Sequence, residues 1–129
     1  MDAVAIVTSL ALMQVAYFAF MVGAARQKYG APAPAMTGPE EFLRAFRVHM
    51  NTVENIVIFI PAMWLFGYFI DPMWAAGIGV VFIISRFMYR SAYLKDPSGR
   101  SLAFGISFLV NTVLVVGTIV KASMNLLSS

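Results

Sequence analysis

Long apolar stretches dominate this chain and restrict it to a helical membrane fold. Of its 129 residues, 60% are hydrophobic and 12% are charged, whereas a soluble domain averages about 45–50% apolar and about 25% charged residues. A membrane-spanning helix needs about 20 apolar residues, and four such stretches occur, near residues 4–25, 48–70, 74–93 and 102–126. The sequence therefore predicts an all-α, integral membrane four-helix bundle in which residues 1–129 form a single domain within the lipid bilayer.

The distribution of basic residues predicts how the chain crosses the membrane. Eight of the nine basic residues gather in the first connection and around the start of the second helix, and again at the end of the third stretch and in the third connection; they are Arg26, Lys28, Arg44, Arg47, Arg86, Arg90, Lys95 and Arg100, and only Lys121 lies on the other side. The second connection, around Asp71-Pro72, has none. Since cytoplasmic loops are rich in Lys and Arg, we expect the first and third connections on the cytoplasmic side and both termini on the opposite side. This topology signal accounts for the net charge of +3, so no nucleic-acid partner is expected.

The chain offers little for metal or thiol chemistry of its own. It contains no cysteine, so a reaction that uses a thiol must take it from an external molecule. One histidine and a few scattered carboxylates provide no cluster of metal ligands, and no metal site is predicted.

A polar stripe leads into the second stretch and marks the candidate site. Arg44, Arg47, Asn51 and Glu54 follow the spacing i, i+3, i+7 and i+10, which places them on one face of a helix. The same kind of spacing recurs at the end of the third stretch, in Arg86, Tyr89 and Tyr93. Arginine binds carboxylates and glutamate binds ammonium groups, so these side chains suit a small zwitterionic ligand. Anchoring of the helices at the membrane interface is the alternative explanation, because basic residues and tyrosines are common there.

The stripe also carries a family resemblance. The segment Arg47-Val-His49-Met-Asn51-Thr-Val-Glu54, preceded by Thr37-Gly38-Pro39 and followed by Phe59-Ile-Pro61-Ala-Met-Trp64, resembles the second-helix signature of the MAPEG family. This family comprises membrane-associated proteins in eicosanoid and glutathione metabolism. Further likeness lies in Val22-Gly-Ala-Ala-Arg26, in Arg86-Phe-Met-Tyr89-Arg-Ser-Ala-Tyr93, and in Arg100, which follows Tyr93 by seven residues. The similarity thus extends over nearly the whole chain.

The resemblance implies a homotrimer that binds glutathione as a co-substrate between neighbouring subunits, near the cytoplasmic face. By position, Arg100 would be the catalytic residue beside the glutathione sulfur, where a guanidinium lowers the pKa of the thiol. The residues implied to bind glutathione are Arg26, Arg47, His49, Asn51, Glu54, Tyr89 and Tyr93. Of these, Arg26 and His49 would come from the adjacent subunit, which agrees with His49 pointing away from the stripe.

Two departures from the family pattern narrow the expected reaction. Asn55 stands where leukotriene synthases have a tyrosine, and Gln27 stands where they have a second arginine that serves the lipid-epoxide half of their reaction. We therefore expect a glutathione transferase that conjugates glutathione to lipophilic electrophiles in detoxification, with glutathione-dependent peroxidase activity as a second reaction to be tested. Two alternatives stay open, a non-catalytic member that presents lipids and a small multidrug exporter. The exporter is disfavoured because the first stretch has no carboxylate beyond Asp2.

Overall fold

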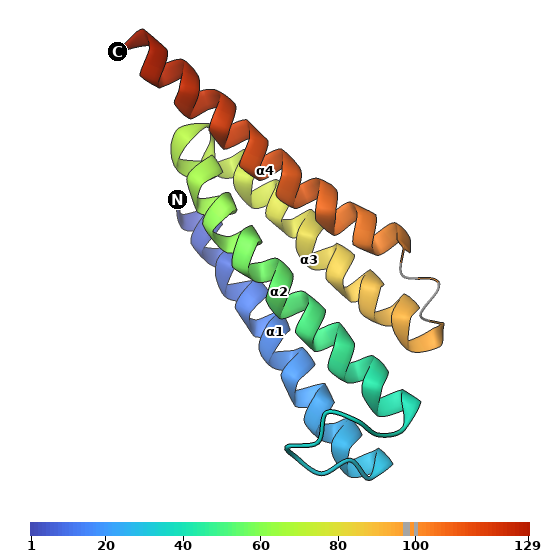
Figure 1. The fold of residues 1–129 in the computed structure, drawn as a ribbon. Helices are drawn as coiled ribbons and strands as arrows, with labels where there is room; N and C mark the ends of the chain where they lie inside the picture. The colour runs from blue at the N-terminus through green and yellow to red at the C-terminus, as the bar shows by residue number, and fades with distance from the viewer. Residues whose placement is uncertain (97–98, 100) are drawn as a thin grey trace.

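Four long antiparallel helices make up the protein (Figure 1). A computed structural model describes residues 1–96, 99 and 101–129, with α1 at Asp2–Tyr29, α2 at Glu40–Phe69, α3 at Pro72–Lys95 and α4 at Ser101–Ser128. Each helix is long and apolar enough to cross a membrane. The all-helical, four-span architecture predicted from the sequence is thereby confirmed, and it fits a multi-pass integral membrane protein.

The ends of the helices follow from local sequence. Gly30 ends α1 in the left-handed conformation, with φ of 70°, and its backbone N–H donates to the carbonyl of Arg26. Asp71 caps the start of α3, since its side chain accepts hydrogen bonds from the N–H groups of Met73 at 2.8 Å and Trp74 at 3.1 Å. Pro72 occupies the first helical position, where its missing N–H has no cost. The turn between α2 and α3 is therefore tight.

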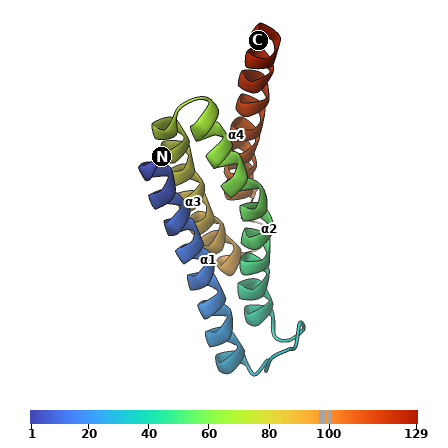
Figure 2. The same ribbon diagram turned by 90° about the vertical axis from the view of Figure 1, so that its left-hand side faces the viewer.

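The two ends of the bundle differ in what they contain. Both termini and the α2–α3 turn lie at one end, and the α1–α2 and α3–α4 connections lie at the other, which we call the loop end (Figures 1 and 2). Figure 2 also shows that the last part of α4 extends beyond the other helices, and residues 123–129 are exposed. The common position of the termini agrees with the predicted topology, and the side of the membrane that each end faces stays a prediction.

The α2–α3 hairpin is the centre of the bundle. Both α1 and α4 pack against α2 and α3. The rings of Phe59 and Phe82 stack across the hairpin with centroids 3.9 Å apart and planes 6° apart. Close packing at this point depends on Gly79, where a Cβ atom would lie 2.7 Å from both Met63 Sδ and Val7 Cγ1. The hairpin therefore provides the rigid support on which the polar residues of the site are placed.

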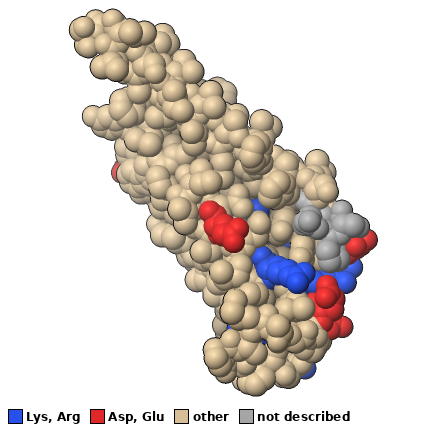
Figure 3. All heavy atoms as spheres, viewed as in Figure 1, with Lys and Arg blue, Asp and Glu red and all other residues tan. Residues whose placement is uncertain are grey.

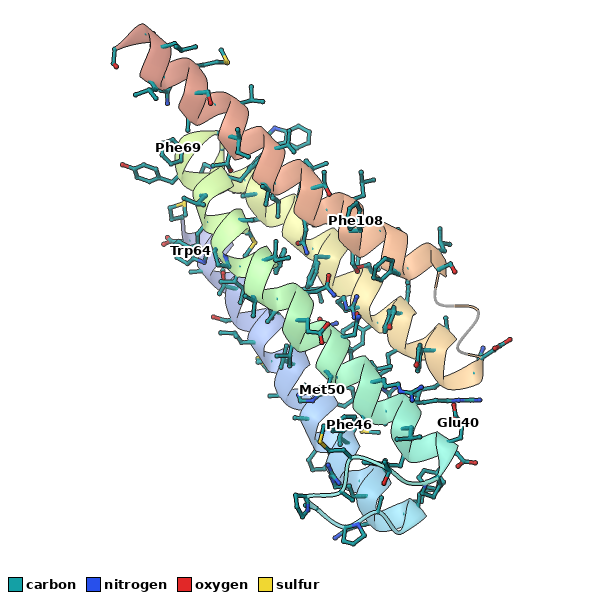
Figure 4. All side chains as sticks on the ribbon, viewed as in Figure 1. Glu40, Phe46, Met50, Trp64, Phe69 and Phe108 are labelled. Carbon is teal, nitrogen blue, oxygen red and sulfur yellow. The ribbon has the colours of Figure 1, made fainter. Side chains whose placement is uncertain are left out.

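Large apolar side chains cover the outside of the bundle, as expected of a surface in contact with lipid. Phe108 on α4 is 65% exposed and points away from the helices (Figure 4). Trp64, Tyr68 and Trp74 are exposed toward the end that holds the termini, where amphipathic rings favour the membrane interface. The indole N–H of Trp64 donates to the Thr8 hydroxyl at 2.8 Å and so ties α2 to α1.

Candidate functional site

Arg86 on α3 is the centre of a polar network inside the bundle. Among the described residues it is the largest fully buried side chain, with no exposed surface. In the described part of the chain no carboxylate pairs with it. A buried charge is costly unless hydrogen bonds replace its hydration. The neighbours that supply those bonds are therefore as important to the bundle as Arg86 itself.

The hydrogen bonds of Arg86 reach two other helices. Its Nη2 lies 2.6 Å from Asn51 Oδ1 and 3.0 Å from Thr52 Oγ1, and its Nε lies 3.2 Å from the same threonine oxygen. Its Nη1 lies 3.2 Å from Ser107 Oγ, which is 2.8 Å from Ser85 Oγ. The network thus joins α2, α3 and α4 and holds the side chain of Asn51 against the bundle interior.

Two tyrosines continue this polar region toward the loop end of α3. Tyr89 and Tyr93 are buried, and their rings stack with centroids 5.6 Å apart and planes 22° apart. The guanidinium carbon of Arg86 lies 4.3 Å from the centroid of the Tyr89 ring, which is a cation–π contact. The side chains of Arg47 on α2 and Tyr93 on α3 are close enough to interact electrostatically. The predicted tyrosines of α3 therefore lie beside the predicted ligand-binding residues of α2.

Arg47, Asn51 and Glu54 share one face of α2. Arg47 and Glu54 are exposed and Asn51 is half-buried. Within the described part of the chain Glu54 has no ion-pair partner. In the view of Figure 3, charged side chains gather toward the loop end of the molecule, and the half of the visible molecular surface toward the C-terminus is nearly free of them. Two opposite charges thus face outward from one helix, about 10 Å apart along its axis at 1.5 Å per residue.

Arg44, the first member of the predicted stripe, is committed to the structure of the loop end. Its Nη1 donates to the backbone carbonyls of Leu94 at 3.0 Å and Lys95 at 3.3 Å. Its Nε forms an ion pair with Glu40 at 3.3 Å, and Glu40 lies at the start of α2 (Figure 4). A cation that binds the last carbonyls of a helix stabilises its negative dipole end. We therefore assign Arg44 to capping α3 and leave it out of the candidate site.

Arg26 also has partners within its own subunit. Its Nη1 donates to the carbonyls of Ala31 at 3.2 Å and Ala35 at 2.7 Å, and its guanidinium carbon lies 4.8 Å from the centroid of the Phe42 ring. These contacts hold the α1–α2 connection against α2. His49 is half-buried on α2. That Arg26 and His49 reach the site of an adjacent subunit stays a prediction, and Arg100 lies outside the residues that the structure describes.

Several residues of the network escaped sequence analysis because they are small and uncharged. Thr52 and Ser107 look like ordinary polar interruptions of apolar helices, and in the sequence Asn55 stands out only as a departure from a family pattern. In the structure, Asn55 Nδ2 donates to the backbone oxygen of Asn51 at 2.9 Å and to its Oδ1 at 3.2 Å. Their positions relative to Asn51 are the signal that the sequence offers for Thr52 and Asn55, because Thr52 follows Asn51 directly and Asn55 comes one turn later.

The hollows of the surface lie beside these residues rather than at them. A cleft of about 270 Å³ at the loop end is lined by α1, α2 and α3, including Lys28, Arg44 and Arg90. A groove of about 240 Å³ between α2 and α4 has an apolar lining that includes Val57 and Val115. In the described part of the chain no three His, Cys, Asp or Glu side chains gather where they could hold a metal ion.

The fold and the site define a multi-pass helical membrane protein. Its α2–α3 hairpin encloses Arg86 and presents polar side chains toward the loop end. The sequence profile of the MAPEG family matches residues 4–120. The chain belongs to the MAPEG family.

Individual relatives are similar over most of their length. An uncharacterised protein of Synechocystis is 39% identical over 117 residues, which cover 91% of this chain and 85% of that protein. Human microsomal glutathione S-transferase 2 is 37% identical over 112 residues, covering 87% of this chain and 76% of the transferase. Bovine leukotriene C4 synthase is 33% identical over 102 residues, covering 77% and 68%.

Proposed function

We propose that this protein is a membrane-bound glutathione transferase that joins the glutathione thiolate to lipophilic electrophiles. The observation that carries the proposal is the outward face of α2. There the exposed guanidinium of Arg47 and the carboxylate of Glu54, which has no ion-pair partner among the described residues, flank the amide of Asn51. Ionisable groups in a spanning segment are costly and mark functional sites. Relatives named as a glutathione transferase and a leukotriene synthase support the same reaction class.

The chemistry of this face matches the ends of glutathione, which carries two carboxylates and one ammonium group. Arg47 supplies a planar fork of donors that suits a carboxylate. Glu54 supplies an acceptor of the opposite charge, suited to the ammonium. Together with the Asn51 amide, these groups can orient a folded or extended tripeptide along the helix. We infer that Tyr89 and Tyr93 line the same site from α3.

The proposed reaction needs a thiolate and an electrophile in contact. Glutathione supplies the sulfur, which agrees with the absence of cysteine from the chain. We propose that Arg100 stabilises the thiolate, because a nearby cation lowers the pKa of a thiol. An apolar electrophile can arrive from the lipid along the groove between α2 and α4, whose lining residue Val57 lies one turn beyond Glu54. Nucleophilic attack by sulfur on the electrophile then forms the thioether and releases the leaving group.

We further propose that the active form is a homotrimer with the site between subunits. An exposed Arg47 and Glu54 on a spanning helix face lipid in an isolated subunit, and a neighbouring subunit would shield them. The same arrangement lets the opposite face of α2, with His49, serve an adjacent site. Crosslinking in detergent and native mass spectrometry test the subunit number directly.

Binding separates the proposed enzyme from a non-catalytic lipid-presenting protein. Purified protein is titrated with glutathione by calorimetry, together with Glu54→Gln and the matched control Glu41→Gln at the exposed start of the same helix. The loss of a charged hydrogen bond costs about 1.5–3 kcal/mol, so Glu54→Gln should weaken binding roughly tenfold or more while Glu41→Gln binds normally. Equal affinities of Glu54→Gln and the unmodified protein for glutathione would indicate that the polar stripe of α2 anchors the helix at the membrane interface. No binding by the unmodified protein would favour the lipid-presenting function.

Activity is tested by a panel of electrophiles. The protein and glutathione are incubated with aryl halides and, separately, with lipid hydroperoxides. Conjugation of the halides supports the transferase, and oxidation of glutathione by the hydroperoxides identifies the accompanying peroxidase reaction. Binding of glutathione without either reaction would refute the proposed enzyme.

A further inference from the structure

The side chain of Asn51 is fixed in one orientation by two donors. Its Oδ1 accepts a hydrogen bond from Arg86 Nη2 at 2.6 Å and a second from Asn55 Nδ2 at 3.2 Å. A guanidinium can only donate, so the amide atom that faces Arg86 must be the oxygen. An amide oxygen has two lone pairs, and both are occupied. Neither rotation of the amide by half a turn nor acceptance of a further strong bond is compatible with these partners.

The amide nitrogen of Asn51 is left for something outside the subunit. Within the described residues, Nδ2 donates to no neighbour, and it is not among the buried polar atoms that lack a partner. It therefore lies on the accessible side of a half-buried residue, between Arg47 and Glu54 on the same face. The surface that Asn51 presents to a ligand is consequently a pair of N–H donors.

We propose that Arg86 and Asn55 are positioning residues that lock Asn51 as a donor, so that Asn51 binds a carboxylate of the ligand rather than its ammonium group. The proposal rests on the proposed function in taking glutathione as that ligand. It assigns Arg47 and Asn51 together to one carboxylate, and it leaves Glu54 for the ammonium. The ligand then lies with a carboxylate toward the loop end and its ammonium deeper along α2.

Arg86 is suited to this role because it cannot move or reach the ligand. It has no exposed surface, and its fork is held by Thr52 and Ser107 while its face lies on the ring of Tyr89. A fixed positive charge on the oxygen side of an amide polarises the group and strengthens its N–H groups as donors. Arg86 therefore acts on the ligand only through Asn51.

Asn55 gains a function from the same geometry. As well as bonding Oδ1, its Nδ2 donates to the backbone oxygen of Asn51 at 2.9 Å. It thus occupies the second lone pair that Arg86 leaves open. Asn55 therefore helps to set the polarity of the Asn51 amide.

The decisive substitution is Asn51→Asp, compared with Asn51→Leu. The aspartate keeps an acceptor for Arg86 and adds an ion pair, but it presents an oxygen to the ligand where Asn51 presents N–H groups. We expect Asn51→Asp to unfold at a higher temperature in detergent than Asn51→Leu and to bind glutathione at least tenfold more weakly than the unmodified protein. Glutathione affinity equal to or above that of the unmodified protein would show that Asn51 accepts from the ammonium, and would overturn the proposal.

A double-mutant cycle tests whether Arg86 acts through Asn51. Arg86→Met, Asn51→Leu and the double variant are titrated with glutathione, and Asn55→Leu is measured alongside them as a variant that leaves Arg86 in place. We expect the double variant to bind no more weakly than the weaker single variant, and Asn55→Leu to lose severalfold in affinity. Independent, multiplicative losses would refute the positioning role, as would unchanged binding by Asn55→Leu.

Glutathione binding and the melting temperatures without ligand together distinguish a failure of this proposal from a failure of the proposed function. If the unmodified protein binds no glutathione, both fall. If it binds glutathione and Asn51→Asp does so equally well, only the assignment of Asn51 falls. If Asn51→Asp melts no higher than Asn51→Leu, the pairing of Arg86 with residue 51 is wrong whatever the ligand.

Discussion

Thr52→Val tests whether the bundle depends on hydrogen bonds to the buried arginine. The substitution preserves the size of a fully buried side chain and removes a single oxygen. That oxygen accepts two bonds from Arg86, at 3.0 and 3.2 Å, and donates one to the backbone of Val48 at 2.8 Å. After the change, the Nε–H of Arg86 and one Nη2–H point at a methyl group.

The size of the effect is worked from the two lost bonds to Arg86, because the lost bond to the Val48 carbonyl is matched in the control variant below. Interhelical hydrogen bonds in membrane proteins average about 0.6 kcal/mol each and reach about 1.7, so two of them set a lower figure near 1 kcal/mol. Bonds to charged groups contribute about 1.5–3 kcal/mol each, which sets an upper figure near 6. The remaining hydrogen bonds from Arg86 to Asn51 and Ser107 still stabilise part of the guanidinium charge. We therefore expect the free energy of unfolding to fall by about 2–3 kcal/mol, between these limits.

Thr118→Val is the matched control. Thr118 is also buried in a spanning helix, and its hydroxyl donates to the carbonyl of Leu114 at 2.8 Å. The two variants thus lose the same backbone bond and differ in the bonds to Arg86. Titration with SDS in mixed micelles gives the free energy of unfolding for both. If Thr52→Val and Thr118→Val agree within about 0.5 kcal/mol, the hydrogen bonds to Arg86 add no more stability than a weak membrane hydrogen bond, and the reasoning is refuted.

Three further outcomes are expected. Arg100→Ala should leave glutathione binding nearly intact but lower turnover roughly tenfold or more, because the thiolate loses its counter-charge; unchanged ultraviolet absorbance of the bound thiolate would contradict this role. Trimers mixed from His49→Ala and Glu54→Gln subunits should exceed the weighted mean activity of the two parents if sites are shared between subunits, and equality with that mean would place each site within one subunit. Gly79→Val should cost about 1–3 kcal/mol of stability through overpacking, because a Cβ there lies 2.7 Å from side chains of α1 and α2. Gly77→Val is the control, because no atom lies within 4 Å of the Cβ added there. Equal stabilities of the two variants would refute close packing at Gly79.

The helices were predictable from sequence because their signal is long and redundant. Twenty apolar residues cannot be mistaken for a soluble segment, and the tight turn at Asp71-Pro72 has the chemistry of a helix cap and a first-position proline. The spacing of Tyr89 and Tyr93 likewise sufficed to place them on one face of α3. These features depend on apolar length, periodicity and local capping residues, all of which are read directly from the sequence.

The roles of individual charges were not predictable, because spacing does not show how deeply a side chain is buried. Arg44 and Arg47 belong to the same predicted stripe, yet the first caps α3 and the second is exposed. Its spacing groups Arg86 with Tyr89 and Tyr93, whereas the structure encloses it wholly. Its partners Thr52 and Ser107 come from different helices, and contacts between helices follow from tertiary packing.

The order of Arg86 and its partners along the chain has a consequence for biogenesis. An arginine at the centre of a spanning helix costs about 2.5–3.5 kcal/mol during insertion by the translocon, and Arg86 lies in the loop-end half of α3. Asn51 and Thr52, its closest partners, belong to the helix that precedes it in the chain, whereas Ser107 belongs to the helix that follows it. We therefore expect α3 to enter the membrane as a hairpin with α2, with the charge already bound by its neighbours when it leaves water.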